Sequence, residues 1–371
     1  MPRDHAILRR QFVQGLAAAT VAPSFIPTIA AAARSGRIET CEQDDDDHLS
    51  LSTIPRNVYK IPDPDRMPTD SWFFYVLVHD RQDRQWTPLS VDLTLMAGGG
   101  VVCTSHLGAD HLRILARKRF QRSPTDAPLR TIAQVTSIVL LFREARPLNV
   151  DRVECTLALE GPDGVRCERR LDVAVRTYTP VTQLIFPFRG AGIVTQGAFN
   201  NGGHASWSEM FAVDAMGMDM PTYAFFRGGE GGLESFAGWD REIIAPASGR
   251  VIYARNDVPD QPEPYVIDES TYAGLPDPGF ARGGNQVIID HGHDEFSAIN
   301  HLRQGSVTVA IGDEVRQGQT IGRLGMSGNT DAPHLHYHLQ AGPVEFDCDG
   351  LPITFVNVTQ SLTRGTIFEP A

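Results

Sequence analysis

The sequence predicts an all-β protein with an N-terminal antiparallel β-sandwich of immunoglobulin-like type and a second antiparallel β region after it. Three observations favour this fold class. Alternating or wholly apolar runs are short, turn residues separate them, and helical periodicity is nearly absent. The chain has 371 residues, which is long enough for two domains.

The N-terminal residues have the pattern of an export signal. An Arg-Arg pair precedes an apolar, Ala-rich run that ends at Ala33, and two prolines interrupt this run. The pair resembles a twin-arginine signal. A membrane anchor needs about 20 unbroken apolar residues, which the run lacks. We therefore expect residues 1–33 to be a twin-arginine-like signal peptide. The product would be exported, periplasmic or extracellular, with no stable membrane insertion after signal removal.

Composition limits the partners of the chain. The formal net charge is −12, which argues against nucleic acid or an anionic membrane as the main partner. Residues 34–70 are polar and Pro-rich, and we expect a linker there. The acidic run Asp44–Asp47 is interpreted as solvated chain, with a metal-attracting tail as the minor alternative.

Two of the five cysteines, Cys155 and Cys167, flank a predicted hairpin turn around Gly164. The register of this hairpin places Leu159 opposite Cys167 and Cys155 opposite Leu171. The two thiols then face the same core but lie too far apart for a disulfide. They are interpreted as small buried residues without a function.

The predicted β-sandwich covers residues 71–190 and gathers no catalytic residue types. Its histidines, His79, His106 and His111, are scattered and are interpreted as structural or surface residues. The expected strands are Trp72–His79, Ser90–Met96, Thr131–Phe142, Val153–Leu159, Val165–Thr177 and Gln183–Phe188.

The second β region is expected at residues 191–345, followed by a C-terminal tail, 346–371. Seven of the twelve histidines fall between His204 and His338. A Pro- and acid-rich insertion, 256–282, is expected to be a surface loop. The expected strands are Phe211–Asp214, Glu242–Ala245, Arg250–Ala254, Gln286–Asp290, Ser297–His301, Thr320–Leu324 and His334–Gln340.

The last of these strands carries three histidines at alternate positions. Because successive side chains of a strand point to opposite faces, His334, His336 and His338 share one face. Two adjacent imidazoles can converge on one metal ion, but the outer pair lies roughly 13 Å apart. The strand therefore supplies one or two ligands, with His336 in either pair. The remaining ligands come from elsewhere, because a hydrolytic zinc site usually has three protein ligands and one open position.

Motifs in the second region occur in the order found in one enzyme family. The pieces are Gly203-His204 with Phe211–Asp214, the Ala-Pro-x-x-Gly-x-Val turn Ala245–Val251, Asn300–Leu302, Val309–Gly322, and Gly325–Gly328 with Pro333–His336. In these pieces the sequence from about Asn200 to Pro343 resembles the lysostaphin-type (LytM-like) zinc metallopeptidases, with the insertion as an interruption.

The resemblance implies a site and a chemistry. It implies that His204, Asp214 and His336 bind one Zn²⁺ and that His301 and His334 are catalytic. Zinc lowers the pKa of water that it binds toward about 7 and polarises a carbonyl. An imidazole with a pKa near roughly 6.5 can accept a proton from that water, stabilise an oxyanion and protonate the leaving amine.

The implied function is a zinc metalloendopeptidase that acts on cross-links or stem peptides of peptidoglycan, or on other peptide substrates. Two departures from the family pattern are Gly203, where Ser is frequent, and His338, where Glu is common. We expect His338 to line the cleft or to support a ligand. His291 and His293 are interpreted as turn residues.

Two other classes of function compete with the enzyme. One is a non-hydrolytic activator or binding module for another cell-wall hydrolase; such relatives typically lose metal ligands, and this chain keeps all three. The other is a zinc-storage or zinc-delivery protein that uses the histidine-rich half and the acidic run.

Overall fold

A computed structural model gives the structure of the chain. It describes residues 49–60, 70–80, 84, 86–119, 135–144, 148–162, 164–197, 204, 208–229, 231–276, 278–345, 348–360 and 362–371. The predicted signal peptide and the acidic run lie outside these residues, so the export prediction stays a prediction.

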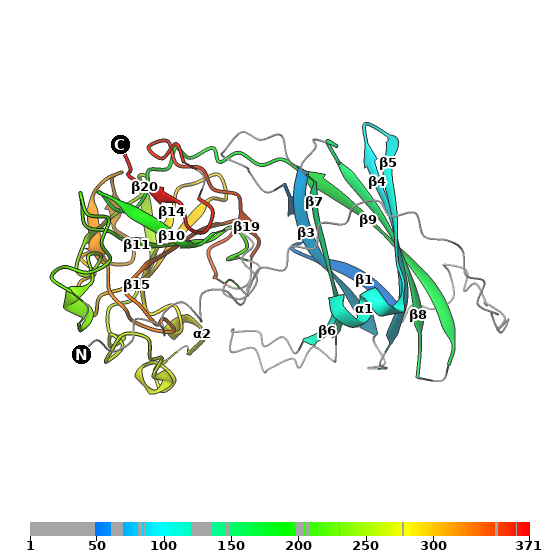
Figure 1. Ribbon diagram of the computed structural model, residues 1–371, viewed down its shortest axis with the longest axis horizontal. Coiled ribbons are helices and arrows are strands. Elements are labelled where there is room, and N and C mark those ends of the chain that lie inside the picture. Colours follow the sequence, from blue (N-terminus) through cyan, green and yellow to red (C-terminus); the bar gives the residue numbers. More distant parts are fainter. Residues whose placement is uncertain are drawn as a thin grey trace, which may run out of the picture. The chain divides into compact units, whose positions relative to one another are not determined.

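Nearly all regular structure in the described residues is β-strand, which confirms the predicted all-β class (Figure 1). The helices there are short: α1 (Ala109–Leu115), α2 (Pro278–Ala281), and the 3-10 turns η1 (Leu233–Ser235) and η2 (Glu269–Thr271). Within the described part of the chain, no helix has the length and apolarity needed to cross a membrane.

The N-terminal β region contains two sheets. The first has four strands in the order β1 (Leu49–Ile54), β3 (Asp70–Asp80), β7 (Val135–Glu144), β6 (Ala116–Arg119). The second has five in the order β2 (Val58–Tyr59), β9 (Arg166–Arg176), β8 (Arg152–Glu160), β4 (Thr87–Ala97), β5 (Gly100–Leu107). All neighbours pair antiparallel except β2 with β9.

Alternation along the strands builds one core between these sheets. Trp72 and Phe74 of β3 are buried in the same cluster as Leu157 and Leu159 of β8. The immunoglobulin-like type of this region stays a prediction, because the strand order does not establish it.

Strand β1 lies inside the stretch predicted to be a linker, and this prediction is wrong there. The strand has the alternating sequence Leu-Ser-Leu-Ser and pairs with β3, and its Leu49 is buried. The period-2 pattern is present in the sequence, but the polar and Pro-rich surroundings obscured it.

The predicted cysteine hairpin is confirmed. In the β8–β9 pair Leu159 lies opposite Cys167 and Cys155 lies opposite Leu171. Gly164 in the turn has a φ of 79°, which is the left-handed conformation that the turn requires. Both cysteines are buried and unbridged.

The C-terminal β region is built on a nine-stranded antiparallel sheet. Its order is β16 (Glu314–Val315), β13 (Gly249–Ala254), β14 (Asn285–Asp290), β15 (Phe296–Leu302), β18 (Leu335–Gln340), β11 (Val213–Gly217), β10 (Gly192–Gln196), β20 (Ile367–Phe368), with β19 (Gly350–Leu351) beside β18. Strands β12 (Glu242–Ile244) and β17 (Thr320–Arg323) form a separate pair.

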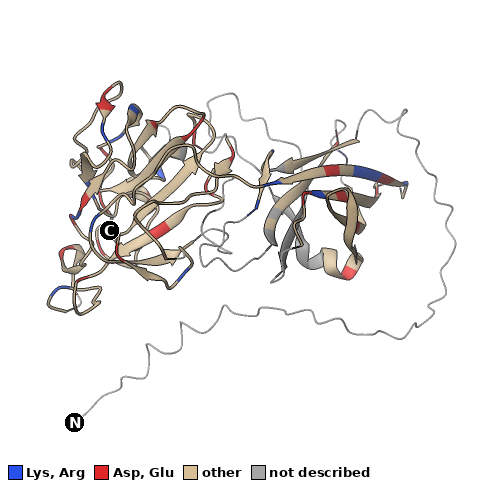
Figure 2. Ribbon diagram, turned by 90° about the horizontal axis from the view of Figure 1, so that it is seen from above, with Lys and Arg blue, Asp and Glu red and all other residues tan. Residues whose placement is uncertain are grey.

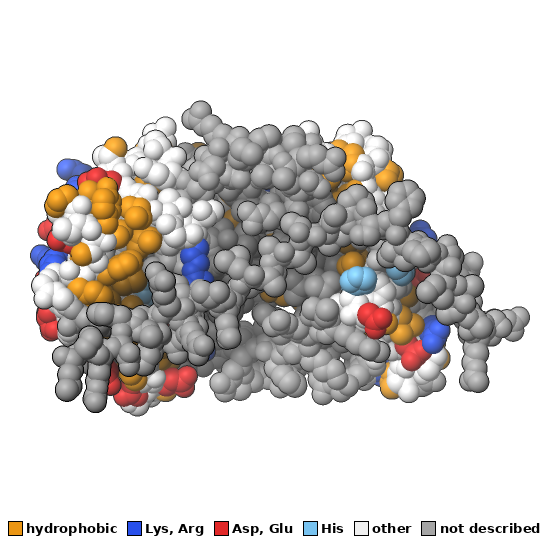
Figure 3. Space-filling view, viewed as in Figure 1, with side chains coloured by type: hydrophobic (Ala, Val, Ile, Leu, Met, Phe, Trp, Pro, Cys, Tyr) orange, Lys and Arg blue, Asp and Glu red, His pale blue; other side chains and the backbone are white. Residues whose placement is uncertain are grey.

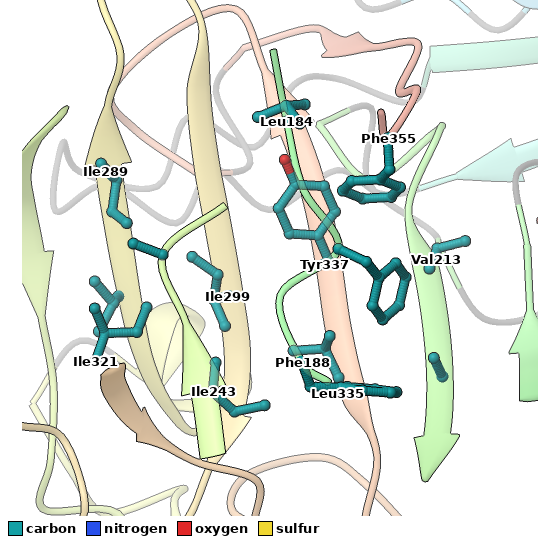
Figure 4. Close-up of a cluster of buried hydrophobic side chains, with 14 of the residues drawn as sticks. Leu184, Phe188, Val213, Ile243, Ile289, Ile299, Ile321, Leu335, Tyr337 and Phe355 are labelled. Atoms are coloured by element: carbon teal, nitrogen blue, oxygen red, sulfur yellow. The ribbon is translucent and has the colours of Figure 1, made fainter. Parts of the chain in front are cut away.

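One face of this sheet is packed against apolar side chains. Leu335, Tyr337 and Leu339 of β18 are buried in a large cluster with Ile299, and Figure 4 shows Leu335, Tyr337 and Ile299 among its members. Because side chains alternate along a strand, the opposite face of β18 carries His336 and His338. The predicted division of this strand into an apolar and an imidazole face is confirmed.

The prediction that residues 346–371 form a tail outside the β region is wrong. Strand β20 pairs with β10, β19 pairs with β18, and Phe368 is 1% exposed. The last residues complete the sheet and its core. Conversely, the expected strand Gln183–Phe188 is not a strand but makes isolated bridges through Leu184 and Phe188, both in the core.

Charge and exposed apolar surface are spread over the molecule. Acidic and basic residues are interspersed along the ribbons (Figure 2). Hydrophobic side chains reach the surface of the C-terminal region (Figure 3). The largest exposed apolar side chains of its insertion are Tyr265, Val266 and Ile267.

Candidate metal centre

Three predicted ligands come together at the edge where β11 meets β18. Asp214 of β11 lies directly opposite His336 of β18 in the strand register, and His204 precedes β11. The Asp214 Oδ1 atom lies 2.8 Å from His336 Nδ1, and Oδ2 lies 3.2 Å from His204 Nε2. One ligand atom from each of the three residues lies within 4.8 Å of the other two. The structure thus brings together residues far apart in the sequence, as predicted.

The donor set fits a zinc ion. Two imidazole nitrogens and one carboxylate oxygen are ligand types that zinc binds, and one atom of each residue lies within 4.8 Å of the other two. Both ring nitrogens of His204 are buried. Nε2 lies near the Asp214 carboxylate without hydrogen-bond geometry, and Nδ1 has no hydrogen-bond partner among the described residues. An imidazole buried in this way is costly unless a further group satisfies it. A metal ion at Nε2 is such a group.

The carboxylate is the charge centre of the cluster. Burial disfavours the charge of Asp214, but the imidazoles of His334 and His204 outweigh this effect and hold its pKa well below the usual range. Burial also disfavours the imidazolium of His336, yet its hydrogen bond to Asp214 raises its pKa to about 9. Nδ1 of His336 therefore faces a position where positive charge, from a proton or from a metal, is favoured.

His301 reaches the site through an unusual backbone conformation. Asn300 lies opposite His336, so regular alternation would turn the next residue, His301, to the other face. His301 instead has a φ of 62°, which is uncommon for a residue other than glycine. Its ring centroid lies 4.8 Å from that of His334 and 5.9 Å from that of His336.

Two backbone carbonyls orient the rings of His301 and His334. His301 Nδ1 lies 2.8 Å from the carbonyl of Ser327, and His334 Nδ1 lies 2.9 Å from the carbonyl of Ala332. A carbonyl only accepts, so each Nδ1 carries the proton and each neutral ring presents Nε2 as an acceptor. Thr330 Oγ1 adds a contact of 3.0 Å to His334.

The two rings differ in charge preference. Burial and the neighbouring imidazoles of His334 and His336 hold the pKa of His301 well below its usual value, so His301 is neutral at pH 7. Burial disfavours the charge of His334, but Asp214, with a carboxylate oxygen 3.6 Å from Nε2, outweighs it and raises the pKa. The uniform pKa near 6.5 expected from the sequence therefore does not describe this pair.

Sequence reasoning missed two carboxylates beside the cluster. Glu209 Oε1 lies 3.8 Å from His336 Nε2. Glu345 is fully buried, accepts a hydrogen bond from Asn300 Nδ2, and has its pKa raised to about 7 by burial and by Glu209. Neither residue stands in a motif, and only the folded chain brings them to His336.

His338 has a position that the sequence left open. Its Nδ1 lies 3.0 Å from Nε2 of the candidate ligand His336, and His338 itself is fully buried. Other histidines in the described part of the chain have partners of their own or lie in turns. His291 bonds to the Ser248 carbonyl and to Ser297, His293 has the positive φ of a turn residue, and His106 pairs with Asp92 on an exposed surface.

The insertion 256–282 is more than a surface loop. It has a small buried cluster of Val258, Tyr272 and Ala281. Gln261 donates to the carbonyl of Gly328, and Tyr265 donates its backbone N–H to the carbonyl of Asp331. These bonds hold the loop that leads into His334.

In this all-β region two imidazoles and a carboxylate converge on one point, and two more imidazoles lie beside it, which is an arrangement suited to a metal-dependent hydrolase. Residues 229–348 match the family described as Peptidase family M23. The chain therefore carries a domain of this family. The matched segment contains His301, His334 and His336, whereas His204 and Asp214 lie before it.

Curated relatives match short parts of the chain. Peptidoglycan DD-endopeptidase ShyC of Vibrio cholerae is 34% identical over 96 residues, which are 26% of this chain and 18% of the relative. Murein hydrolase activator NlpD of Escherichia coli is 30% identical over 125 residues, 33% of this chain and 26% of the relative. This chain thus spans about a fifth of the length of the curated relatives that it matches.

Among solved structures, the chain has a match in the catalytic domain of the prophage-encoded M23 protein EnpA from Enterococcus faecalis. It is 16% identical, covers 47% of this chain and 95% of its own, and has a TM-score of 0.29.

Proposed function

We propose that the chain is a zinc-dependent endopeptidase that hydrolyses peptide bonds in the cross-links or stem peptides of peptidoglycan. The observation that carries this proposal is the convergence of His204, Asp214 and His336 on one point, with the rings of His301 and His334 beside it. The metallopeptidase family and the endopeptidases among the relatives support the reaction class.

In this proposal His204, Asp214 and His336 hold one zinc ion. Bound zinc supplies Lewis acidity toward a carbonyl and lowers the pKa of water. Asp214 leaves the centre with a net positive charge, because it is the one anionic ligand of the three. His301, neutral and with Nε2 free to accept, takes the proton of the attacking water. His334, which favours the protonated form, donates to the developing oxyanion and to the leaving amine.

The proposed substrate and location follow from the relatives rather than from the site. ShyC is named as a peptidoglycan endopeptidase, and we extend that substrate to this chain together with export by the twin-arginine-like signal. Cleavage of other peptides is a second substrate within the same chemistry.

The second candidate is an activator of another wall hydrolase, favoured by the similarity to NlpD. The two candidates differ in whether the zinc ligands and His301 are needed for the effect on the wall. An activator works without hydrolysis, so its effect survives loss of His301.

Purified sacculi test the proposal. The native protein, His336→Ala, His301→Ala and His106→Ala are incubated with sacculi and with an isolated cross-linked peptide. Zinc content and released muropeptides are measured. His106→Ala is the matched control, because this exposed histidine lies outside the cluster.

Native protein and the control are expected to hold one zinc ion and to release muropeptides. His336→Ala is expected to lose zinc and activity, and His301→Ala to lose activity alone. A native protein that holds zinc but cleaves neither sacculi nor peptide contradicts the peptidase proposal. Stimulation of a second hydrolase by both native protein and His301→Ala supports the activator.

A further inference from the structure

Strand β18 carries a continuous chain of hydrogen bonds that starts at the candidate ligand His336. His336 Nε2 lies 3.0 Å from His338 Nδ1, and His338 Nε2 lies 2.9 Å from Gln340 Oε1. Gln340 Nε2 lies 2.9 Å from the backbone carbonyl of Gly342. His336, His338 and Gln340 are 4%, 0% and 0% exposed, so solvent does not substitute for these partners.

The direction of each of these hydrogen bonds follows from the last acceptor in the series, the Gly342 carbonyl. The Gly342 carbonyl can only accept, so the amide of Gln340 donates Nε2–H to it. Oε1 of Gln340 is then the acceptor, and His338 donates Nε2–H to it. A neutral imidazole with its proton on Nε2 has a lone pair on Nδ1, and this lone pair accepts Nε2–H of His336.

This direction has a consequence at the ligand. With the proton of His336 held on Nε2, the free lone pair of the neutral ring is on Nδ1. Nδ1 is the nitrogen that lies 2.8 Å from Asp214, on the side where the three ligand atoms converge. In the other tautomer, a proton on Nδ1 would occupy the coordination position, and Nε2 and His338 Nδ1 would face each other as two acceptors.

We propose that His338 and Gln340 are positioning residues that fix the tautomer of His336, so that it coordinates the metal through Nδ1. The proposal rests on the zinc centre of the proposed function and deepens it. Glu209, with an oxygen 3.8 Å from His336 Nε2, lies beyond hydrogen-bond distance and does not replace His338. Partners of this kind orient metal-bound imidazoles, and their loss typically weakens metal affinity about 10–100-fold.

A purely structural role for these hydrogen bonds is the competing explanation, because buried polar groups need partners wherever they lie. A matched pair of variants separates the two roles. Asn and Leu have the same branched side-chain skeleton, and each leaves Gln340 without its donor. Only Asn places an acceptor, Oδ1, at the same distance along the side chain as His338 Nδ1.

The test measures zinc affinity of the full chain by competition with a chromogenic chelator. His338→Asn is expected to stay within about threefold of the native protein, and His338→Leu to lose about 10–100-fold. Thermal unfolding of both zinc-free variants checks that they are equally folded. Equal zinc affinity of the two folded variants overturns the proposal.

A measurement on the native protein keeps the proposal testable if both variants fail to fold. Long-range ¹H–¹⁵N NMR spectra of the imidazoles are recorded for the zinc-loaded and zinc-free forms. We expect His338 protonated on Nε2 alone in both forms, and His336 protonated on Nε2 and coordinated through Nδ1 in the loaded form. A proton on Nδ1 of His338, or coordination of His336 through Nε2, contradicts the inference.

These results are independent of hydrolysis. A native protein that binds zinc through His336 Nδ1 but cleaves nothing refutes the proposed function and leaves the positioning role intact. A native protein that cleaves peptides, with equal zinc affinity in His338→Asn and His338→Leu, supports the proposed function and refutes the positioning role.

Discussion

Asp214 holds the candidate centre together at the scale of single residues. Oxygens of this one carboxylate lie 2.8 Å from His336, 3.2 Å from His204 and 3.6 Å from His334. A buried carboxylate is stable only when positive charge or hydrogen bonds surround it. The apolar run before Asp214 is therefore compatible with a charged residue only because the imidazoles meet it in the fold.

His301 is the residue whose replacement best separates catalysis from metal binding. It is not one of the three converging ligands, and its Nδ1 is engaged by the Ser327 carbonyl. We expect His301→Gln to lower kcat by about 10²–10⁴-fold, the usual contribution of a general base, with one zinc ion retained. Peptide hydrolysis and metal content of the same sample check this. Loss of zinc together with activity would instead make His301 a ligand.

Glu295 supplies a second prediction at this scale, about pH and stability. Its buried carboxylate accepts hydrogen bonds from Tyr178 Oη at 2.6 Å and from the backbone N–H groups of Val181 and Thr182 at 2.7 and 2.8 Å. Burial alone would raise the pKa of Glu295, but these bonds outweigh it and lower the pKa. An acid with a lowered folded pKa stabilises the fold above its unfolded pKa, and this contribution is lost as pH falls through the folded pKa.

We therefore expect Glu295→Gln to reduce the free energy of unfolding by about 2 kcal/mol at pH 7, the typical value of hydrogen bonds to a charged group. The difference from the native protein should shrink as the pH is lowered below about 4.3, the unfolded pKa of Glu. Urea unfolding at a series of pH values measures it, with the exposed Glu314→Gln as the control. A difference that stays constant with pH would contradict the role of the charge.

The C-terminal strand gives a prediction at the scale of elements. Phe368 of β20 is 1% exposed in the main core, whereas its neighbour Ile367 is 44% exposed. Phe368→Ala is expected to cost about 3–5 kcal/mol of stability, because it removes a buried aromatic side chain. Ile367→Ala should cost well under half of that. Chemical denaturation of both variants compares two positions in one strand, and equal costs would mean that β20 is not part of the core.

The insertion also has a role that one residue tests. Asp260 accepts backbone N–H bonds from Met326 at 2.8 Å and from Gln304 at 3.0 Å, and so ties the insertion to the loop before His334. Asp260→Ala leaves the N–H of the buried Met326 without this partner, at a cost of about 1–3 kcal/mol. We expect lower stability and a lower rate of hydrolysis, whereas the exposed Glu263→Ala should change neither. Native kinetics in a folded Asp260→Ala protein would show that the insertion does not support the site.

The elements differ in how well the sequence predicts them. Strand β18 is predicted almost to its bounds because the Leu-His-Tyr-His-Leu alternation is local information. Strand β20 is not, since two residues carry no period and pair only after the chain has returned to β10. The return of His301 to the imidazole face depends on a positive φ, which strand alternation does not predict. The missed partners Glu209 and Glu345 likewise depend on tertiary contacts.

At the scale of the whole molecule, the number of metal ions separates the functions. Among the described residues, one cluster of at least three His, Cys, Asp or Glu side chains has ligand atoms close enough to share an ion, namely His204, Asp214 and His336. Storage or delivery of zinc requires several loosely held ions. One tightly bound ion is what the enzyme needs.

Metal removal should therefore lower the stability of the folded chain by a definite amount. A ligand that binds only the folded state stabilises it by RT ln(1 + [L]/Kd), which is about 4.1 kcal/mol at 1,000 times Kd. Scanning calorimetry of the native protein with and without a chelator should show a lower Tm without zinc, restored by one equivalent of zinc per chain. His336→Ala should unfold at one temperature regardless of zinc. A native Tm that the chelator does not change, or that keeps rising as several equivalents of zinc are added, would contradict a single structural and catalytic ion at Asp214.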